Sequence, residues 1–300
     1  GAVGAVGAGF LWGASAVVYT HLGHKIGSLV LNLSKGVIAI AYIAVTLIIQ
    51  GDFFPNNIST INLGLLLLSG ILGIGLGDTF YFEALNNLGA RRTLLLEALA
   101  PPLAALIALI ALQETLGLTA WAGIFLTVLG VAWVISERVP GTGNKVVDPL
   151  RGISFALLSA IGQAGGAVLS RAALSTTTIN PLWSTFLRIV GGVLILLLWM
   201  SFKKQSTWWQ PLQSRKLLGI IAVTALFSTY LGIWLQQTAL KYTATGIAQA
   251  LISTSPLFVL PIALWLGEKV SFRAFLGVLV ALGGIVLLFG GRYGVRYLNH

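Results

Sequence analysis

The chain has 300 residues, of which 57% are hydrophobic and 9% are charged, and its mean hydropathy is +0.93. A soluble domain carries about 25% charged residues, so this composition excludes a soluble enzyme, an isolated nucleic-acid-binding domain and a disordered chain. The net charge of +10 comes from 18 Lys and Arg in short gaps between apolar runs, which indicates membrane topology rather than nucleic-acid binding. The chain has no Cys, which excludes disulfides and thiolate metal sites.

The apolar runs predict an all-α integral membrane protein with ten transmembrane helices, because about 20 helical residues cross the hydrocarbon core of a bilayer. In chain order the predicted spans are 3–20, 28–49, 62–86, 93–113, 118–136, 151–172, 181–202, 216–240, 245–266 and 271–290. A gap rich in Pro and Gly follows the fifth span and divides the chain into two five-helix halves. The predicted organisation is a first repeat at 1–137, a linker loop at 138–150, a second repeat at 151–292 and a tail at 293–300.

The two halves resemble each other in sequence. Three residues recur 154 positions later: Pro102 as Pro256, Glu114 as Glu268 and Gly123 as Gly277. A basic residue also lies about seven positions into the second span, Lys35, and into the seventh, Arg188. Because each half has five spans, the second copy enters the membrane with the opposite orientation, and inverted repeats of this kind are typical of secondary transporters.

Short motifs occur in the same order in both halves. They are Leu11-Trp12-Gly13, Ala84-Leu85, Leu88-Gly89-Ala90 and Leu99-Ala100-Pro101-Pro102 in the first half, and Ala239-Leu240, Ser253-Thr254-Ser255-Pro256 and Leu266-Gly267-Glu268 in the second. Over almost the whole chain this order resembles the EamA-type family of the drug/metabolite transporter superfamily. The resemblance implies ten helices in two inverted five-helix repeats, a central cavity, and export or exchange of small metabolites, amino acids or drugs.

Three acidic residues lie within the predicted spans: Asp78, Glu83 and Glu97, which are more acids than the family pattern has there. A charged side chain at the centre of a bilayer costs roughly 2.5–3.5 kcal/mol, so such residues usually face the interior of the bundle or water. The acids are candidates for a proton relay or for the counter-ion of a cationic substrate; the alternative is a structural pair with a basic residue such as Lys35. Lys35 and Arg188 are themselves candidates for anion binding or for structural contacts between helices.

Polar and aromatic residues recur at helical spacing along several spans, and a polar stripe in a lipid-embedded bundle is expected to face inward. Together with the three acids they form the predicted cavity lining and substrate site: Trp12, Ser15, Tyr19, Tyr81, Gln163, Tyr230, Trp234, Gln237, Gln249 and Ser253. Such a lining suits a small amphipathic metabolite; the alternative role is hydrogen bonding between helices.

Prolines interrupt the fourth span at Pro101 and Pro102 and the ninth at Pro256 and Pro261. Proline removes a helix hydrogen bond, and broken helices at equivalent places in two halves point to a transport site or a hinge. The four prolines are therefore predicted hinge residues, with an ordinary tolerated kink as the alternative.

The residues do not indicate a cofactor or a reaction. His21 and His24 have a spacing that a metal could use, but no third ligand accompanies them, so no metal site is predicted. No grouping of Ser, His and Asp suggests hydrolysis, and no ATP-binding motif is present. The expected partners are a small-molecule substrate, the lipid bilayer and, in a coupled transporter, protons.

The basic residues bear on orientation. The side that holds the odd-numbered loops carries twelve Lys and Arg, and the other side carries four, Arg171, Lys241, Arg292 and Arg296. The positive-inside rule then places the odd-numbered loops in the cytoplasm and both termini outside, whereas the resemblance places both termini inside. The expected location is a bacterial-type inner membrane.

The sequence favours a secondary transporter that exports or exchanges small organic metabolites by alternating access, with proton coupling through Asp78, Glu83 or Glu97. The alternative is an uncoupled channel or facilitator, which predicts flux that does not saturate and no counterflow. A membrane-embedded enzyme acting on lipid is the third reading, but no reactive constellation near an interface supports it.

Overall fold

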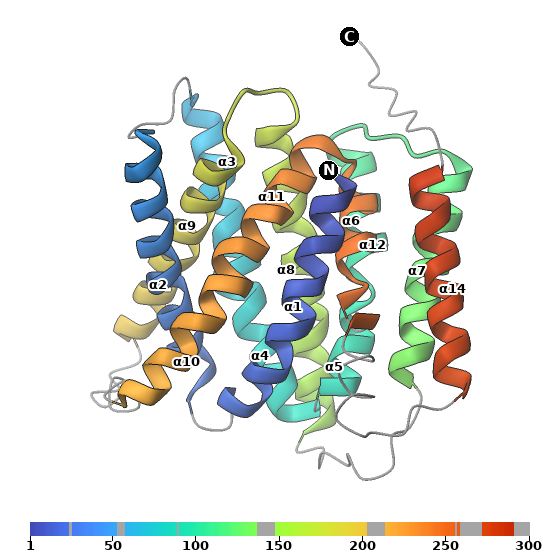
Figure 1. The fold of residues 1–300 in the computed structure, drawn as a ribbon, viewed down its shortest axis with the longest axis horizontal. Helices are drawn as coiled ribbons and strands as arrows, with labels where there is room; N and C mark the ends of the chain where they lie inside the picture. The colour runs from blue at the N-terminus through green and yellow to red at the C-terminus, as the bar shows by residue number, and fades with distance from the viewer. Residues whose placement is uncertain are drawn as a thin grey trace.

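The computed structural model describes residues 1–23, 26–52, 58–88, 90–136, 148–202, 214–255, 257–258 and 272–290. These residues form a bundle of long helices that cross it from end to end, with no strand among them (Figure 1). Within this part of the chain, seven helices are long and apolar enough to cross a membrane, and Ala2–Ser15 and Phe275–Leu288 are shorter apolar stretches. Helices that satisfy their own backbone groups are the form in which such a chain crosses lipid.

The first half consists of α1 (Ala2–Gly23), α2 (Ser28–Gln50), α3 (Thr60–Gly70), η1 (Ile71–Gly77), α4 (Asp78–Leu88), α5 (Ala90–Glu97), α6 (Ala100–Ala111) and α7 (Leu118–Ser136). The second half consists of α8 (Pro149–Leu174), α9 (Pro181–Phe202), α10 (Arg215–Ala225), η3 (Leu226–Leu231), α11 (Gly232–Tyr242), α12 (Thr245–Ile252) and α14 (Phe272–Gly290). The described helices account for nine of the ten predicted spans. The remaining span, 245–266, is described only in its first part, so the number of ten stays a prediction.

Local signals set several helix ends. The side chains of Ser59, Asp148 and Ser214 each accept a hydrogen bond from the backbone N–H three residues further on, at the start of α3, α8 and α10. Pro149 occupies the first position of α8, where its missing N–H is not needed. α2 ends at Gly51, whose φ of 69° lies in the left-handed region that glycine tolerates.

The α3–α4 and α10–α11 spans are each interrupted at their midpoint by a π-helical segment, η1 and η3 respectively. In both spans 11 residues of α-helix precede the segment and 11 follow it. The segments begin 155 residues apart, the spacing that also separates Ala84-Leu85 from Ala239-Leu240. Long π-helical segments are rare and are found frequently at functional sites, so their duplication marks the middle of these two spans.

Helices of the two halves pack closely through glycines. A Cβ atom added at Gly70 of α3 would overlap the backbone carbonyl of Arg188 in α9, and one added at Gly191 of α9 would overlap that of Leu67. The helices α7 and α14 lie side by side (Figure 1), with Gly130 of α7 directly against the backbone of α14. Small residues permit this close approach. Helices in lipid associate through the resulting van der Waals packing, because the hydrophobic effect does not drive their association there.

The first helices of the two halves run in opposite directions. α1 begins beside Thr243, at the end of the bundle where α11 ends and α12 begins (Figure 1). α8 instead finishes at that end, where Arg171 contacts the backbone of Leu240 and Lys241. This end of the bundle, where α12 begins, is called the α12 end below, and the opposite end, where α5 begins, is called the α5 end.

Replacing Gly70 with alanine is expected to destabilise the protein by about 1–3 kcal/mol, because the added methyl group pushes α3 and α9 apart. Gly64 of the same helix has open space at its Cβ position, so Gly64→Ala is the matched control. The control should be neutral or stabilising by up to about 1 kcal/mol. Thermal unfolding in detergent compares the two variants, and equal melting temperatures would contradict the importance of this contact.

Candidate functional site

A cavity of about 230 Å³ lies in the middle of the bundle and is lined by both halves. Lining residues come from α1, α2, η1 and α4 to α7 of the first half, and from α8, α9, η3, α11 and α12 of the second. A cavity between repeats near the middle of the spans is where secondary transporters bind their substrates.

Twelve residues that the sequence singled out line this cavity: Trp12, Ser15, Tyr19, Lys35, Asp78, Tyr81, Glu97, Pro101, Gln163, Arg188, Gln249 and Ser253. Five others do not belong to the described lining: Glu83, Pro102, Tyr230, Trp234 and Gln237. Pro256 and Pro261 lie outside the described residues, as do the side chains of His21 and His24. Among the described residues no group of three His, Asp or Glu side chains is placed to hold a metal ion.

One predicted stripe faces other helices instead of the cavity. The hydroxyl group of Tyr230 lies 3.0 Å from that of Thr46 in α2, and Gln237 accepts a hydrogen bond of 2.8 Å from Ser184 in α9. The ring of Tyr230 stacks on Trp234. The residues of the same span that do line the cavity were all missed by the sequence analysis: Ser228, Thr229, Ile233 and Gln236.

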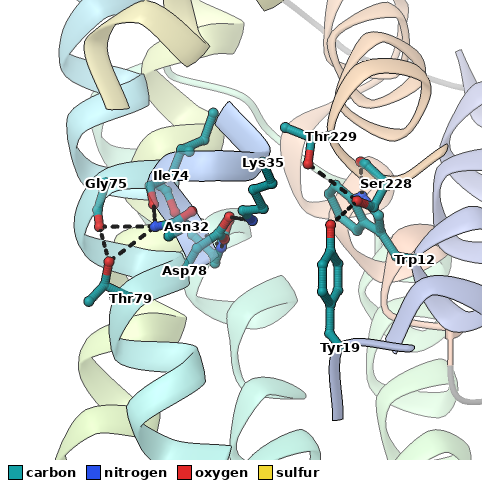
Figure 2. Close-up of polar contacts among 12 residues, drawn as sticks. Trp12, Tyr19, Asn32, Lys35, Ile74, Gly75, Asp78, Thr79, Ser228 and Thr229 are labelled. Carbon is teal, nitrogen blue, oxygen red and sulfur yellow. Dashed lines mark hydrogen bonds and ion pairs between the residues drawn. The ribbon is translucent and has the colours of Figure 1, made fainter. Parts of the chain in front are cut away.

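The ion pair of Lys35 and Asp78 lies at the wall of the cavity (Figure 2). Nζ of Lys35 is 2.5 Å from Oδ2 of Asp78, and Oδ1 of the same carboxylate accepts a hydrogen bond of 2.7 Å from Nε2 of Gln163. The ammonium group also lies 5.2 Å from the ring centroid of Phe82 and 5.8 Å from that of Tyr19, within the range of cation–π attraction. Asp78 is therefore held by a basic and an amide side chain, one from each half.

Side chains from neighbouring helices bond the carbonyls of the two π-helical segments. Asn32 of α2 donates to a carbonyl of η1 at 2.7 Å, as Figure 2 shows. Gln163 of α8 donates to the carbonyl of Gly73 at 3.2 Å, and Trp12 of α1 donates to that of Ser228 at 2.7 Å (Figure 2). Gly73 and Ser228 are 155 residues apart, so the first helix of each half bonds the π-helical segment of the other.

Two further charged residues of the lining have unused hydrogen-bonding capacity. Arg188 is 1% exposed and donates from Nη1 to Gln236 at 2.9 Å, while its Nε has no partner among the described residues. Glu97, the last residue of α5, has a buried Oε1 that also lacks a partner in the described part of the chain. Buried polar atoms are normally satisfied, so Arg188 is suited to binding an acceptor group of a solute, and Glu97 is suited to binding a solute or a proton.

A buried ion pair joins the two halves at the α12 end. Nε of Arg171 donates to Oε1 of Glu114 at 2.6 Å, and both residues are 3% exposed. Nη1 of Arg171 also donates to the carbonyls of Leu240 and Lys241 at 2.8 Å, while Oε2 of Glu114 accepts the N–H of Thr245 at 2.9 Å. Arg171 lies at the end of the bundle to which the charge count assigned it, but its guanidinium group is buried where four helix ends meet and does not face water.

The cavity extends toward the α5 end and stops before the α12 end. Tyr19 and Leu85 line it within about one helical turn of the α5 end. Leu240, which follows Leu85 by 155 residues and is its equivalent, is 0% exposed and lies at the α12 end. Equivalent positions of the two halves thus line the cavity near one end of the bundle and are closely packed at the other.

Long apolar helices around a central cavity define a multi-pass membrane protein. The EamA-like transporter family matches residues 1–136 and 150–290, and the chain belongs to this family. The match confirms the resemblance drawn from the motifs and the two-repeat architecture, and membership makes the chain an integral membrane transporter of small solutes. A solved structure described as "Crystal structure of protein" shares the fold with a TM-score of 0.70 at 16% identity, over 95% of this chain and 94% of the other. No curated protein sequence matched the chain.

Proposed function

We propose that the protein is a secondary transporter that exports or exchanges a small organic metabolite, such as an amino acid or a drug, by alternating access. The observation that carries the proposal is the cavity between the halves, which has four charged side chains in its wall and is packed shut at the α12 end. Alternating access requires a site that communicates with one side of the membrane at a time.

The closed end argues against an uncoupled channel or facilitator. A channel conducts through a continuous passage, whereas here the Glu114–Arg171 pair and the fully buried Leu240 fill the path at the α12 end. Opening that end requires the contacts between α6, α8, α11 and α12 to separate. A rearrangement of this size in each cycle is a property of a carrier.

Asp78 and Glu97 are the proposed proton-binding groups, since both line the cavity. Protonation of Asp78 would remove the charge that holds Lys35. The same carboxylate accepts the hydrogen bond from Gln163 of the second half, so binding of a proton would also alter a contact between the halves. Glu83, the third acid singled out in the sequence, is less suited because it does not belong to the described lining. Pro101 and Pro102 are the second and third residues of α6, and the break between α5 and α6 is the proposed hinge.

The proposed architecture is ten transmembrane helices in two inverted repeats, at 1–137 and 151–292, with a linker loop at 138–150 and a tail at 293–300. The cavity extends toward the side that carries most of the basic residues, the α5 end. The positive-inside rule places that side in the cytoplasm, so the conformation described here would face inward in a bacterial-type inner membrane. A reporter fused to His300 tests this, because the rule predicts that the fusion lies outside.

Counterflow in proteoliposomes is expected to be selective and saturable. Vesicles containing the protein are preloaded with a mixture of amino acids and other small metabolites, and mass spectrometry identifies the compounds that leave. An imposed pH gradient should change the rate of release if transport is coupled to protons. Protein-free vesicles are the control. Broad release that does not saturate would contradict the carrier and favour the facilitator.

A further inference from the structure

We propose that Arg188 binds an anionic group of the transported solute and that this group is a carboxylate. The inference rests on the transport function proposed above, because it concerns the same cavity. It comes from a comparison of equivalent positions in the two halves, in which one basic residue has an acidic partner and the other has none.

Arg188 is a buried cation whose bonded neighbour is neutral. Its guanidinium group donates to Gln236, its Nε has no partner, and no carboxylate among the described residues forms an ion pair with it. Asp78 attracts it from a longer distance, but both oxygens of that carboxylate are already engaged, by Lys35 and Gln163. A buried charge without a close partner is strongly destabilising, so an anion supplied by the solute would complete the site.

The equivalent base of the first half is satisfied within the protein. Lys35 precedes Arg188 by 153 residues and pairs with Asp78. The position 155 residues after Asp78 is occupied by Ile233, which lines the cavity, and the two residues before Ile233 are not acidic either. The repeated arrangement therefore contains two bases and one acid, and it leaves a place for one more carboxylate.

The surroundings of Arg188 favour a carboxylate over a larger anion. A guanidinium group presents N–H groups in one plane, which the two oxygens of a carboxylate accept together. Gly73 gives the group its space, since a Cβ atom there would lie 2.6 Å from Nη2 of Arg188. Asp78 and Glu97 line the same cavity, so a phosphate dianion would be repelled more strongly than a single carboxylate.

The test compares carboxylates with their uncharged amides on the purified full chain. Melting temperatures are measured with a set of small monocarboxylates, amino acids among them, and with the primary amide of each. One or more carboxylates should stabilise the wild type, and the matching amides should require roughly 30-fold higher concentrations for the same shift. Arg188→Gln is expected to abolish this preference.

Two substitutions of Ile233 separate charge from size. Ile233→Asp places a carboxylate where the first half has Asp78, so it should abolish stabilisation by added carboxylates. Ile233→Asn has the same size without the charge and should retain the preference for carboxylates over amides. Without any ligand, the Asp variant should melt several degrees above the Asn variant, because only the former supplies a partner for Arg188.

The outcomes distinguish this inference from the transport function. The inference is overturned if the Asp variant melts no higher than the Asn variant, if no carboxylate stabilises the wild type, or if the preference survives Arg188→Gln. Absence of counterflow together with the expected pattern of melting temperatures would contradict transport and leave the carboxylate site standing. Counterflow of amides as fast as that of carboxylates would contradict the carboxylate site and leave the transport function standing.

Discussion

Replacement of Glu114 by glutamine is expected to destabilise the protein by about 3–5 kcal/mol and to open the α12 end of the cavity. Arg171 would lose its carboxylate partner at a position that is 3% exposed. The same carboxylate also accepts the backbone N–H and the hydroxyl group of Thr245, where it faces the positive end of the α12 dipole. A neutral amide reproduces the size of this group but not its charge, so the helix ends that it joins should separate more readily.

Cysteine labelling can measure this opening directly, because the chain contains no Cys of its own. A single cysteine at the cavity position Ser253 should react with a membrane-impermeant maleimide from the α5 side only, and from both sides once Glu114→Gln is added. Asp52→Asn makes the same chemical change at a surface acid and should alter stability by less than about 0.5 kcal/mol. One-sided labelling of a folded Glu114→Gln protein would mean that the pair does not close the cavity.

Replacing Asp78 with asparagine is expected to abolish the effect of a pH gradient on transport and to lower stability by about 2 kcal/mol. The loss of stability is smaller than at Glu114 because the Asp78 side chain is 20% exposed, so water can partly solvate the remaining ammonium group of Lys35. Counterflow with and without a pH gradient, together with thermal unfolding, measures the two effects.

Two comparison variants make the Asp78 result specific. Adding Lys35→Gln to Asp78→Asn removes both charges, so the double variant should be more stable than the two single losses predict, by about 1–2 kcal/mol, while remaining insensitive to the gradient. Glu83→Gln is the matched change at an acid that does not belong to the described lining, and it should keep the gradient dependence. Gradient-driven flux that is unchanged in Asp78→Asn would show that Asp78 does not carry the coupling.

The positions of the helices were predictable because an apolar run of about 20 residues has one stable structure in lipid. The spacing between recurring motifs also predicted which positions of the two halves are equivalent, and the structure places η1 and η3 at equivalent positions. The π-helical conformation of η1 and η3 was not predicted. Their sequences, ILGIGLG and LFSTYL, consist largely of residues that α-helical spans also use.

The lining of the cavity was predicted less completely, for two physical reasons. A polar stripe must face protein in a membrane bundle, but Tyr230 and Gln237 show that it can face another helix as well as a cavity. A basic residue near the end of a span can reach water or be buried, and its sequence position does not distinguish the two. Arg171 is buried by a partner that lies 57 residues away in the chain, Glu114, which sequence comparison had identified only as a marker of the repeat.

The two π-helical segments are also the points at which the α3–α4 and α10–α11 spans are expected to bend. Helices often kink at π-helical turns. Because η1 and η3 lie at the midpoints of their spans and both contribute to the cavity wall, the two bending points lie at the same depth in the bundle. Trp12 of α1 donates a hydrogen bond to η3, and Gln163 of α8 donates one to η1, so each π-helical segment is bonded to the first helix of the opposite half. A bend in one half would therefore act, through these two hydrogen bonds, on the first helix of the other half.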